Sequence, residues 1–442
     1  MEIEIKVIST ETIKPSSPTP KSLQKHNLSF LDQLAPPFFM PLVYFYSSNP
    51  KIPNSQKSDH LKKSLSETLS RFYPLAGRLA DNLHVDCNDG GAPFSEAEAD
   101  CDLSQVITNP NPKDMNKFLP FSLNHPSLDF CMAAQATYFR CGGVAVGLLI
   151  SHKIADALSF FSFANSWSAA ARGGTADAPP LPKFDAAAYF PARDIRGYKA
   201  STGMMKEELA TKIFTFHTKK IAILRDRYAA AAAASGGGVG SERRPTRVEA
   251  LSAFIWSRFI SATGMRADPN KIYTVQHAVN LRTRTDPVLP EYHFGNISRV
   301  AIAKPAVGSS GVTDGGVELV RRVREAIKAV DGGFVARLRE GGEHLDLMKE
   351  RMALANKGEL VSFSFTSLCR FPVYEADFGW GKPVWVGSAG FAYKNLVTFM
   401  DTRDGDGIEA WVNLRKEDME KFEADLELQD FLSYHKNYFN FT

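Results

Sequence analysis

The sequence predicts an α/β protein built from two domains. Helical and strand patterns alternate along both halves of the chain, which is typical of helices packed against sheets. The chain has 442 residues, of which 44% are hydrophobic and 23% are charged, an ordinary composition for a globular protein. Because single hydrophobic cores stop growing at about 250–300 residues, this length favours two domains of about 200 residues each. We place the boundary in a proline-rich connection and the segment after it, near residues 185–215.

The first half of the chain alternates strand and helix patterns. Residues 2–8 alternate polar and apolar side chains, as a half-buried strand does, and residues 61–72 repeat leucines along one helical face. Two apolar runs at residues 132–140 and 144–151 flank a Cys-Gly-Gly turn and predict a hairpin. Residues 156–171 predict a helix, so a short turn joins the second hairpin strand to that helix.

The second half contains one low-complexity run and several further helices. Residues 229–234 are all alanine and glycines follow them, which we interpret as a frayed helix end that leads into a flexible loop. Apolar periodicity predicts helices at residues 248–260, 317–330 and 416–432.

Composition and targeting signals exclude several classes of protein. The formal net charge is +3, from 52 basic and 49 acidic residues, and no basic stripe points to nucleic acid. The N-terminus lacks a basic leader before an apolar run, and apolar stretches such as residues 144–150 are too short to span a bilayer. The five cysteines are scattered and form no C-x-x-C pair, which argues against a disulfide framework and a structural zinc site. We therefore expect a cytoplasmic protein that binds no nucleic acid, membrane or metal.

The chain lacks the usual motifs of covalent and nucleotide chemistry. It has no G-x-S-x-G turn for an acyl-enzyme route, no P-loop, and no G-x-G-x-x-G after a strand. Two histidines, His125 and His152, begin an H-x-x-x-D pattern, a spacing that can arise by chance. His125 stands in a polar loop interrupted by proline, so we interpret it as an exposed loop histidine.

His152 has a different context. It follows the apolar run of residues 144–150 and precedes a helix, at the carboxyl end of a buried strand where α/β folds commonly place their sites. A neutral imidazole there can take a proton from an alcohol near pH 7. By this context alone, a satisfied core histidine at a strand end is an equally good interpretation. Asp156 stands where the helix begins, so capping the helix or pairing with an arginine suits it better than direct proton transfer.

Six short blocks of sequence stand out along the chain: LSFLD at residues 28–32, FYPLAGRL at 72–79, SHKIADA at 151–157, VNLRTR at 279–284, FGN at 294–296 and DFGWG at 377–381. These blocks resemble those of the plant BAHD acyltransferases and occur in the order found in that family. They run along nearly the whole chain, and the sequence is most similar to the vinorine-synthase-like branch. That branch acylates alkaloid and other specialised-metabolite alcohols.

The resemblance implies two similar domains of the chloramphenicol-acetyltransferase type, each with a mixed sheet, and a channel between them. Acyl-CoA would enter from one face and a small-molecule alcohol from the other, and His152 would be the general base of a ternary complex without a covalent intermediate. Asp156 would turn away and pair with Arg282. The following residues would support the architecture away from the chemistry: Asp377, Gly379, Trp380 and Gly381.

The resemblance also assigns residues to the donor and to the pocket. Contacts with coenzyme A would come from Thr246, Arg247, Arg284, Ser367 and Arg370, and arginine suits the phosphates of that ligand. Leu368 stands where the family commonly has tryptophan, so we expect a wider or differently shaped acyl or acceptor pocket.

The resemblance suggests a division into a domain of residues 1–195, a crossover at 196–216 and a domain of residues 217–442. A segment near residues 370–400 is a candidate to pack with the first domain.

The leading hypothesis is an acyl-CoA-dependent O-acyltransferase that transfers acetyl or another short acyl group to a hydroxyl of a plant specialised metabolite. Acyl-CoA would be a co-substrate, and no cofactor would be bound permanently. Two alternatives stay open, namely N-acylation of an amine or polyamine and a non-catalytic relative that binds a ligand. A channel that closes around two substrates has no need of a dimer, so we expect a monomer.

Overall fold

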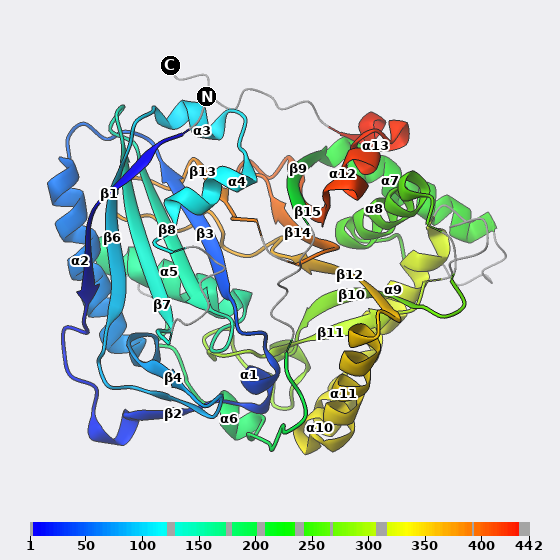
Figure 1. Cartoon of the computed structure of the whole chain (residues 1–442), viewed down its shortest axis with the longest axis horizontal. Coiled ribbons are helices and arrows are strands. Elements are labelled where there is room, and N and C mark those ends of the chain that lie inside the picture. The colour runs from blue at the N-terminus through cyan, green and yellow to red at the C-terminus, as the bar shows by residue number, and fades with distance from the viewer. Residues whose placement is uncertain are drawn as a thin grey trace.

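The computed structural model describes residues 3–121, 129–173, 179–200, 208–234, 243–265, 268–305, 316–390 and 393–432. Two sheets, each covered by helices, form the two parts of the molecule (Figure 1). The predicted α/β class with two sheet-containing domains is therefore confirmed. His125 lies outside the described residues.

The first sheet is mixed and has six strands in the order β1-β6-β7-β8-β3-β13. Its strands are β1 (Ile5–Ile13), β3 (Phe39–Tyr46), β6 (Ala92–Ala99), β7 (Met132–Phe139), β8 (Val144–Ser151) and β13 (Trp385–Gly387). β6 and β7 are parallel, and the other neighbouring pairs are antiparallel. The predicted hairpin is the pair β7–β8, whose residues are all buried, and this burial on both faces explains the uninterrupted apolar runs in the sequence.

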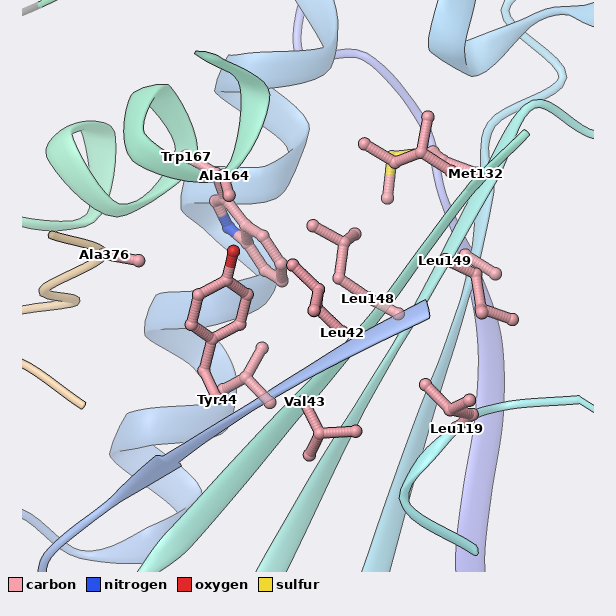
Figure 2. Packing of buried hydrophobic residues seen from close by; sticks show 14 of the residues in the cluster. Leu42, Val43, Tyr44, Leu119, Met132, Leu148, Leu149, Ala164, Trp167 and Ala376 are labelled. Atoms are coloured by element: carbon pink, nitrogen blue, oxygen red, sulfur yellow. The ribbon is translucent and has the colours of Figure 1, made fainter. Parts of the chain in front are cut away.

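Two long helices, α2 (Asn54–Arg71) and α5 (Ala157–Ala171), cover the first sheet, and both were predicted. Figure 2 shows Leu42, Tyr44 and Leu148 of the sheet directed toward Trp167 of α5. The indole Nε1 of Trp167 donates to the carbonyl of Leu61 and to the hydroxyl of Ser64, at 3.2 and 3.1 Å, and so joins α5 to α2. The buried strand, the turn after it and α5 therefore form one rigid unit.

Short elements complete the first domain. They are a small sheet of β2 (Lys25–Asn27), β4 (Arg78–Ala80) and β5 (His84–Asp86), the helices α1 (Phe30–Leu34), α3 (Leu103–Ile107), α4 (Pro112–Met115) and α6 (Ala186–Tyr189), and 3₁₀ turns at Lys21–Leu23, Tyr73–Ala76 and Asn116–Phe118.

The second sheet also has six strands, in the order β11-β10-β12-β14-β15-β9. Its strands are β9 (Leu209–His217), β10 (Ile272–Asn280), β11 (Ser298–Ala303), β12 (Leu360–Ser367), β14 (Leu396–Asp401) and β15 (Gly407–Arg415). β10, β12 and β14 are parallel to one another. Parallel strands end at the same edge of a sheet, so the residues that follow β10, β12 and β14 meet at one edge.

Seven helices belong to the described part of the second domain. They are α7 (Thr218–Ala234), α8 (Arg247–Thr263), α9 (Val317–Ala329), α10 (Gly332–Glu340), α11 (Gly342–Asn356), α12 (Lys416–Glu423) and α13 (Leu426–Phe431), with a 3₁₀ turn at Arg282–Arg284. The alanine run ends α7. The single helix predicted for residues 416–432 is wrong, because Asp425 starts a new helix: its carboxylate accepts a hydrogen bond from the backbone N–H of Leu428 at 2.8 Å.

The first sheet takes its edge strand β13 from the second half of the chain. β13 pairs with β3 of the first sheet, and Val373, Phe378 and Val386 lie in the apolar cluster of that sheet. β9 pairs along its length with β15 of the second sheet. The division into residues 1–195, 196–216 and 217–442 stays a proposal, to which the structure adds that β9 is part of the second sheet. No described helix has the length and hydropathy to cross a membrane.

Candidate active site

His152 lies in the turn between β8 and α5, where the two domains meet. Its backbone N–H donates to the carbonyl of Phe38 at 2.8 Å, and its own carbonyl accepts a hydrogen bond from Nδ2 of Asn296 at 2.7 Å. The rings of Phe38 and His152 meet edge to face, with centroids 5.1 Å apart. Hydrogen bonds from both domains to the backbone of His152 therefore fix the turn, and they give the imidazole a defined place between the domains.

The two nitrogens of the His152 imidazole differ in access. Nδ1 is fully buried and accepts or donates no hydrogen bond. Nε2 makes no bond within the described residues and is not among the buried atoms, so it is the nitrogen that a substrate can reach. Burial is the strongest influence on the pKa of His152 and lowers it below its ordinary value of 6.5, and the charge of Asp156 opposes this only in part. The ring is neutral at pH 7 and able to accept a proton.

The carboxylate of Asp156 is occupied by a buried ion pair. Its Oδ2 lies 2.7 Å from Nη1 of Arg282, and its Oδ1 lies 3.2 Å from Nη2. The two oxygens also accept hydrogen bonds from the backbone N–H groups of Ser159, at 2.9 Å, and Ile297, at 3.1 Å. The bond from Ser159 caps α5, as the sequence suggested.

These bonds determine the charge of Asp156. Burial by itself would raise the pKa of this carboxyl, but the charge of Arg282 and hydrogen bonds from Arg282 and Ser159 outweigh burial and lower the pKa. A carboxylate that stays ionised and fully bonded is a poor proton carrier near neutral pH. Its contacts indicate that Asp156 stabilises the turn that contains His152 and does not transfer a proton.

Backbone carbonyls hold the other edge of Arg282. Nε and Nη2 donate to the carbonyl of His293 at 3.0 and 2.8 Å, and Nη2 also lies 3.3 Å from the carbonyl of Gly295. Gly295 has φ +133°, a conformation that favours glycine, and an added Cβ would come 3.0 Å from the Cβ of Ala186. The guanidinium is 1% exposed and all its nitrogens are bonded.

Asn296 and Asp32 extend this network, although we had noted them only as members of sequence blocks. The backbone N–H and Nδ2 of Asn296 both donate to Oδ1 of Asp32 at 2.8 Å. Asp32 in turn belongs to the capping box of α1. Nearby, the buried Nζ of Lys153 donates to the carbonyls of Gln33 and Ala35, each at 2.9 Å. These bonds hold the segment that leads to Phe38 against the turn of His152.

Four of the five expected donor contacts gather near one carboxylate, that of Asp401 at the end of β14. Nη2 of Arg247 lies 2.9 Å from Oδ1 of Asp401, and the backbone N–H of Arg370 donates to Oδ2 at 2.7 Å. Thr246 caps α8 immediately before Arg247, and Ser367 ends β12 three residues before Arg370. The edge where parallel strands end therefore joins residues that are more than 100 positions apart.

Arg284 is separate from that group. Its Nη1 donates to the carbonyls of Ile327, at 2.7 Å, and Val330 at the end of α9. It makes no bond or ion pair to the other four candidates within the described residues, so its contacts are structural.

A cationic residue near this group was missed by the sequence analysis. Burial and the nearby charge of Arg244, together with that of Arg247, lower the pKa of Arg225. Arg244 is paired with Asp226 at 2.7 Å, while Nε of Arg225 donates to the carbonyl of Pro245. Several arginines at the start of a helix favour the binding of an anion. The RRPTR sequence at residues 243–247, where α8 begins, was the signal in the sequence that could have indicated such a site.

The block of residues 377–381 forms a turn on the first domain. Oδ1 of Asp377 accepts hydrogen bonds from the N–H groups of Gly379 and Gly381, at 2.8 and 2.9 Å. Phe378 packs edge to face on Trp167 at 4.9 Å, and Trp380 stacks on Phe378 at 5.7 Å. These contacts are typical of a structural turn that packs against the hydrophobic core.

Leu368 is 8% exposed and packs in the apolar cluster of the first sheet, although it directly follows β12 of the second. Its backbone N–H donates to the carbonyl of Phe399 at 2.8 Å. Its side chain thus lies at the contact between the domains.

Replacing Asp156 by Asn should destabilise the protein by about 3–5 kcal/mol, because the charge of Arg282 would be left buried without a partner. Urea unfolding at pH 7 measures the loss. The pKa of Asp156 is lower in the folded protein than its ordinary 3.8, so this stabilisation exists above pH 3.8 and disappears as the pH falls through the lowered pKa. Asp194→Asn is the control, since its pair with Arg196 is exposed. An Asp156→Asn protein as stable as that control would contradict the assigned role.

Comparisons with known proteins agree with this geometry. A family model described as the transferase family matches residues 3–429. Epi-neemfruitin B synthase from Melia azedarach is 38% identical over 430 residues, which cover 96% of this chain and 97% of that protein. Stemmadenine O-acetyltransferase from Catharanthus roseus is 36% identical over 435 residues, with 96% and 97% covered.

A solved structure supports the same assignment. The crystal structure of vinorine synthase matches with a TM-score of 0.83 at 35% identity and covers 99% of this chain and 100% of that chain. The ordered blocks, the two mixed sheets and the match over almost the full length thus converge. The chain belongs to the transferase family and is one of the plant BAHD acyl-CoA-dependent acyltransferases.

Proposed function

We propose that this protein transfers acetyl or another short acyl group from coenzyme A to a hydroxyl of a plant specialised metabolite, with His152 as general base. The observation that carries the proposal is the imidazole of His152, which is neutral, lies between the domains and has an accessible Nε2. Relatives that are named O-acetyltransferases favour a hydroxyl acceptor. N-acylation of an amine is the second candidate, because the same base would serve it.

The proposed reaction proceeds in a ternary complex. Nε2 of His152 removes the hydroxyl proton while the oxygen attacks the thioester carbonyl. The resulting tetrahedral intermediate breaks its C–S bond, and the departing thiolate takes the proton from the imidazolium. Atoms and charge balance without an enzyme nucleophile, in agreement with the missing G-x-S-x-G motif. Asp156 stays ionised and bonded to Arg282 throughout.

We assign the phosphates of coenzyme A to the cationic edge around Asp401. Arg247 and Arg370 are expected to bind them, with Thr246 and Ser367 beside these arginines, and we add Arg225. Acyl-CoA is then a co-substrate that leaves after each turnover. We further propose that the enzyme works as a monomer in the cytoplasm.

His152→Ala should lower turnover at least ~100-fold, because a positioned general base contributes about that much. Free thiol released from acetyl-CoA with a panel of alcohols and amines measures turnover. Since burial lowers the pKa of His152, the acidic limb of kcat/KM should lie below pH 6.5, where the ring becomes protonated and loses its function as a base. His84→Ala on the surface of β5 is the control. A His152→Ala protein with near-normal turnover would refute the base, and release with amines alone would favour N-acylation.

Arg225→Ala and Arg247→Ala should each raise the KM for acetyl-CoA by roughly 10- to 150-fold and leave the KM for the acceptor unchanged, since each loses a charge-assisted contact worth about 1.5–3 kcal/mol. Steady-state kinetics with either substrate varied separates the two constants. Arg284→Ala, whose cation bonds to α9, is the matched control. An equal effect on both KM values would place these arginines outside the donor site.

Leu368→Trp should shift the ranking of acyl donors toward shorter chains, because a larger side chain fills space at the contact between the domains. Competing acetyl-, butanoyl- and benzoyl-CoA in one assay gives the ranking. Leu368→Met, with nearly equal volume, is the control. An unchanged ranking in the Trp variant would show that this position does not shape the donor or acceptor pocket.

A further inference from the structure

Arg299 is a partly buried cation for which the described part of the chain supplies no anion. It lies on β11, the outer strand of the second sheet, opposite Val279 of β10. It forms no ion pair with any described carboxylate, although its Nε is fully buried and unbonded. Burial lowers the pKa of Arg299 to about 10, and Tyr198 is the neighbour that opposes this shift. A buried charge without a partner costs free energy that folding has to offset elsewhere.

The guanidinium is nevertheless held in one orientation. Its Nη2 lies 2.7 Å from Nε2 of His344 and 3.2 Å from the sulfur of Met348, both on α11. His344 packs edge to face between Phe30 and Phe334, at 6.3 and 6.0 Å. Burial and the charge of Arg299 lower the pKa of His344 to about 3, so at neutral pH this histidine is an uncharged acceptor. It therefore orients the arginine without neutralising it.

One nitrogen of Arg299 is left for a ligand. Nη1 makes no hydrogen bond to a described residue and, unlike Nε, is not among the buried unbonded atoms. A terminal guanidinium nitrogen carries two N–H donors and no acceptor. An oxygen atom with a negative charge would complete both the hydrogen bonding and the charge of this group.

A line of aromatic side chains connects Arg299 with His152. Tyr198 is close enough to raise the pKa of both Arg299 and Tyr393, and its hydroxyl donates to the carbonyl of Leu34, the last residue of α1, at 3.5 Å. The ring of Tyr393 lies 5.1 Å from that of Phe38, which in turn lies 5.1 Å from the imidazole of His152.

This line lies at the opposite end of β14 from the donor group. Tyr393 precedes the first residue of β14 and Asp401 is its last. Five strand steps of about 3.3 Å separate the two ends of that strand by roughly 17 Å. If coenzyme A binds around Asp401, we expect the acceptor at the other end of β14, on the side of Tyr393 and Arg299.

We propose, building on the function proposed above, that Arg299 determines acceptor specificity by binding a carboxylate of the acceptor through Nη1. The preferred acceptor is then a hydroxy acid whose hydroxyl meets His152 while its carboxylate meets Arg299. A carboxylate fits better than a neutral carbonyl, because only the carboxylate removes the uncompensated charge as well as filling the free donor. Neutral esters of the same acids would bind more weakly.

The first test is stability without substrate. Because no carboxylate among the described residues pairs with Arg299, Arg299→Met should leave the melting temperature unchanged or raise it. Arg282→Met is the matched control, a buried arginine that has a carboxylate partner, and should lower the melting temperature clearly. A loss in Arg299→Met as large as in the control would show that Arg299 is a structural support, and would overturn the proposal.

The second test is selectivity between acids and esters. Cyclic hydroxy acids with one to five rings, each paired with its methyl ester, are assayed with acetyl-CoA by thiol release. The wild type should favour acid over ester in kcat/KM by at least ~10-fold, as expected for a hydrogen bond to a charged group. Arg299→Met should lose this preference, and Arg299→Lys should keep part of it. No preference in the wild type, or an undiminished preference in Arg299→Met, would overturn the role of Arg299.

A binding experiment without acyl-CoA tests the role of Arg299 independently of acyl transfer. Calorimetry with the same acid and ester pairs, without acyl-CoA, is done on His152→Ala and on His152→Ala with Arg299→Met. Tighter binding of acids that requires Arg299, without thiol release by the wild type, would support Arg299 and overturn the acyltransfer. Thiol release without acid selectivity would support the acyltransfer and overturn Arg299. Equal binding of every acid and its ester also overturns the role of Arg299.

Discussion

The bidentate ion pair between Asp156 and Arg282 is the interaction on which the arrangement of the site depends. It joins the turn after β8 in the first domain to the 3₁₀ turn after β10 in the second, across 126 positions of sequence. Removing two charges from water is costly unless the remaining polar atoms are also bonded. Here the carboxylate accepts backbone N–H groups and the guanidinium donates to carbonyls, so the geometry of the pair is tightly specified.

A few consecutive residues connect this ion pair to the turn that contains His152. Arg282 donates to the carbonyls of His293 and Gly295, and Asn296 is the next residue along the chain. The side-chain amide of Asn296 then donates to the carbonyl of His152. The imidazole itself is not part of the polar network: its Nδ1 has no partner and Phe38 covers one edge. The structure therefore separates two environments, a fully bonded ionic cluster that orients the turn and an apolar setting that keeps the base uncharged.

The edge strand β13 strengthens this contact. It comes from the second half of the chain and extends the first sheet, so the chain connects the two domains through a sheet and not only through a linker. Leu368 leaves the second sheet and is buried in the core of the first within a single residue. Loops after such strands can carry specificity, as Leu368 does in our proposal, while both sheets stay fixed.

The local elements and their class followed from the sequence because each rests on contacts between near neighbours. Two apolar runs around a glycine turn predicted the hairpin β7–β8, and helical periodicity predicted α2, α5 and α8. The short interval between β8 and α5 marked His152. The helix predicted for residues 416–432 failed at Asp425, where a side-chain cap competed with the periodicity. The ordered blocks identified the family as well, since each is contiguous in the chain.

The sequence by itself thus determined the elements, the family and the candidate base. Only the tertiary structure decided which candidates meet: it gathered Arg247, Arg370 and the unforeseen Arg225 at one strand edge and left Arg284 with α9. It also gave His152 its lowered pKa and left Arg299 without a carboxylate partner in the described part of the chain. The physical reason is that charge compensation and burial depend on residues brought together from distant parts of the chain, and no local pattern records that proximity.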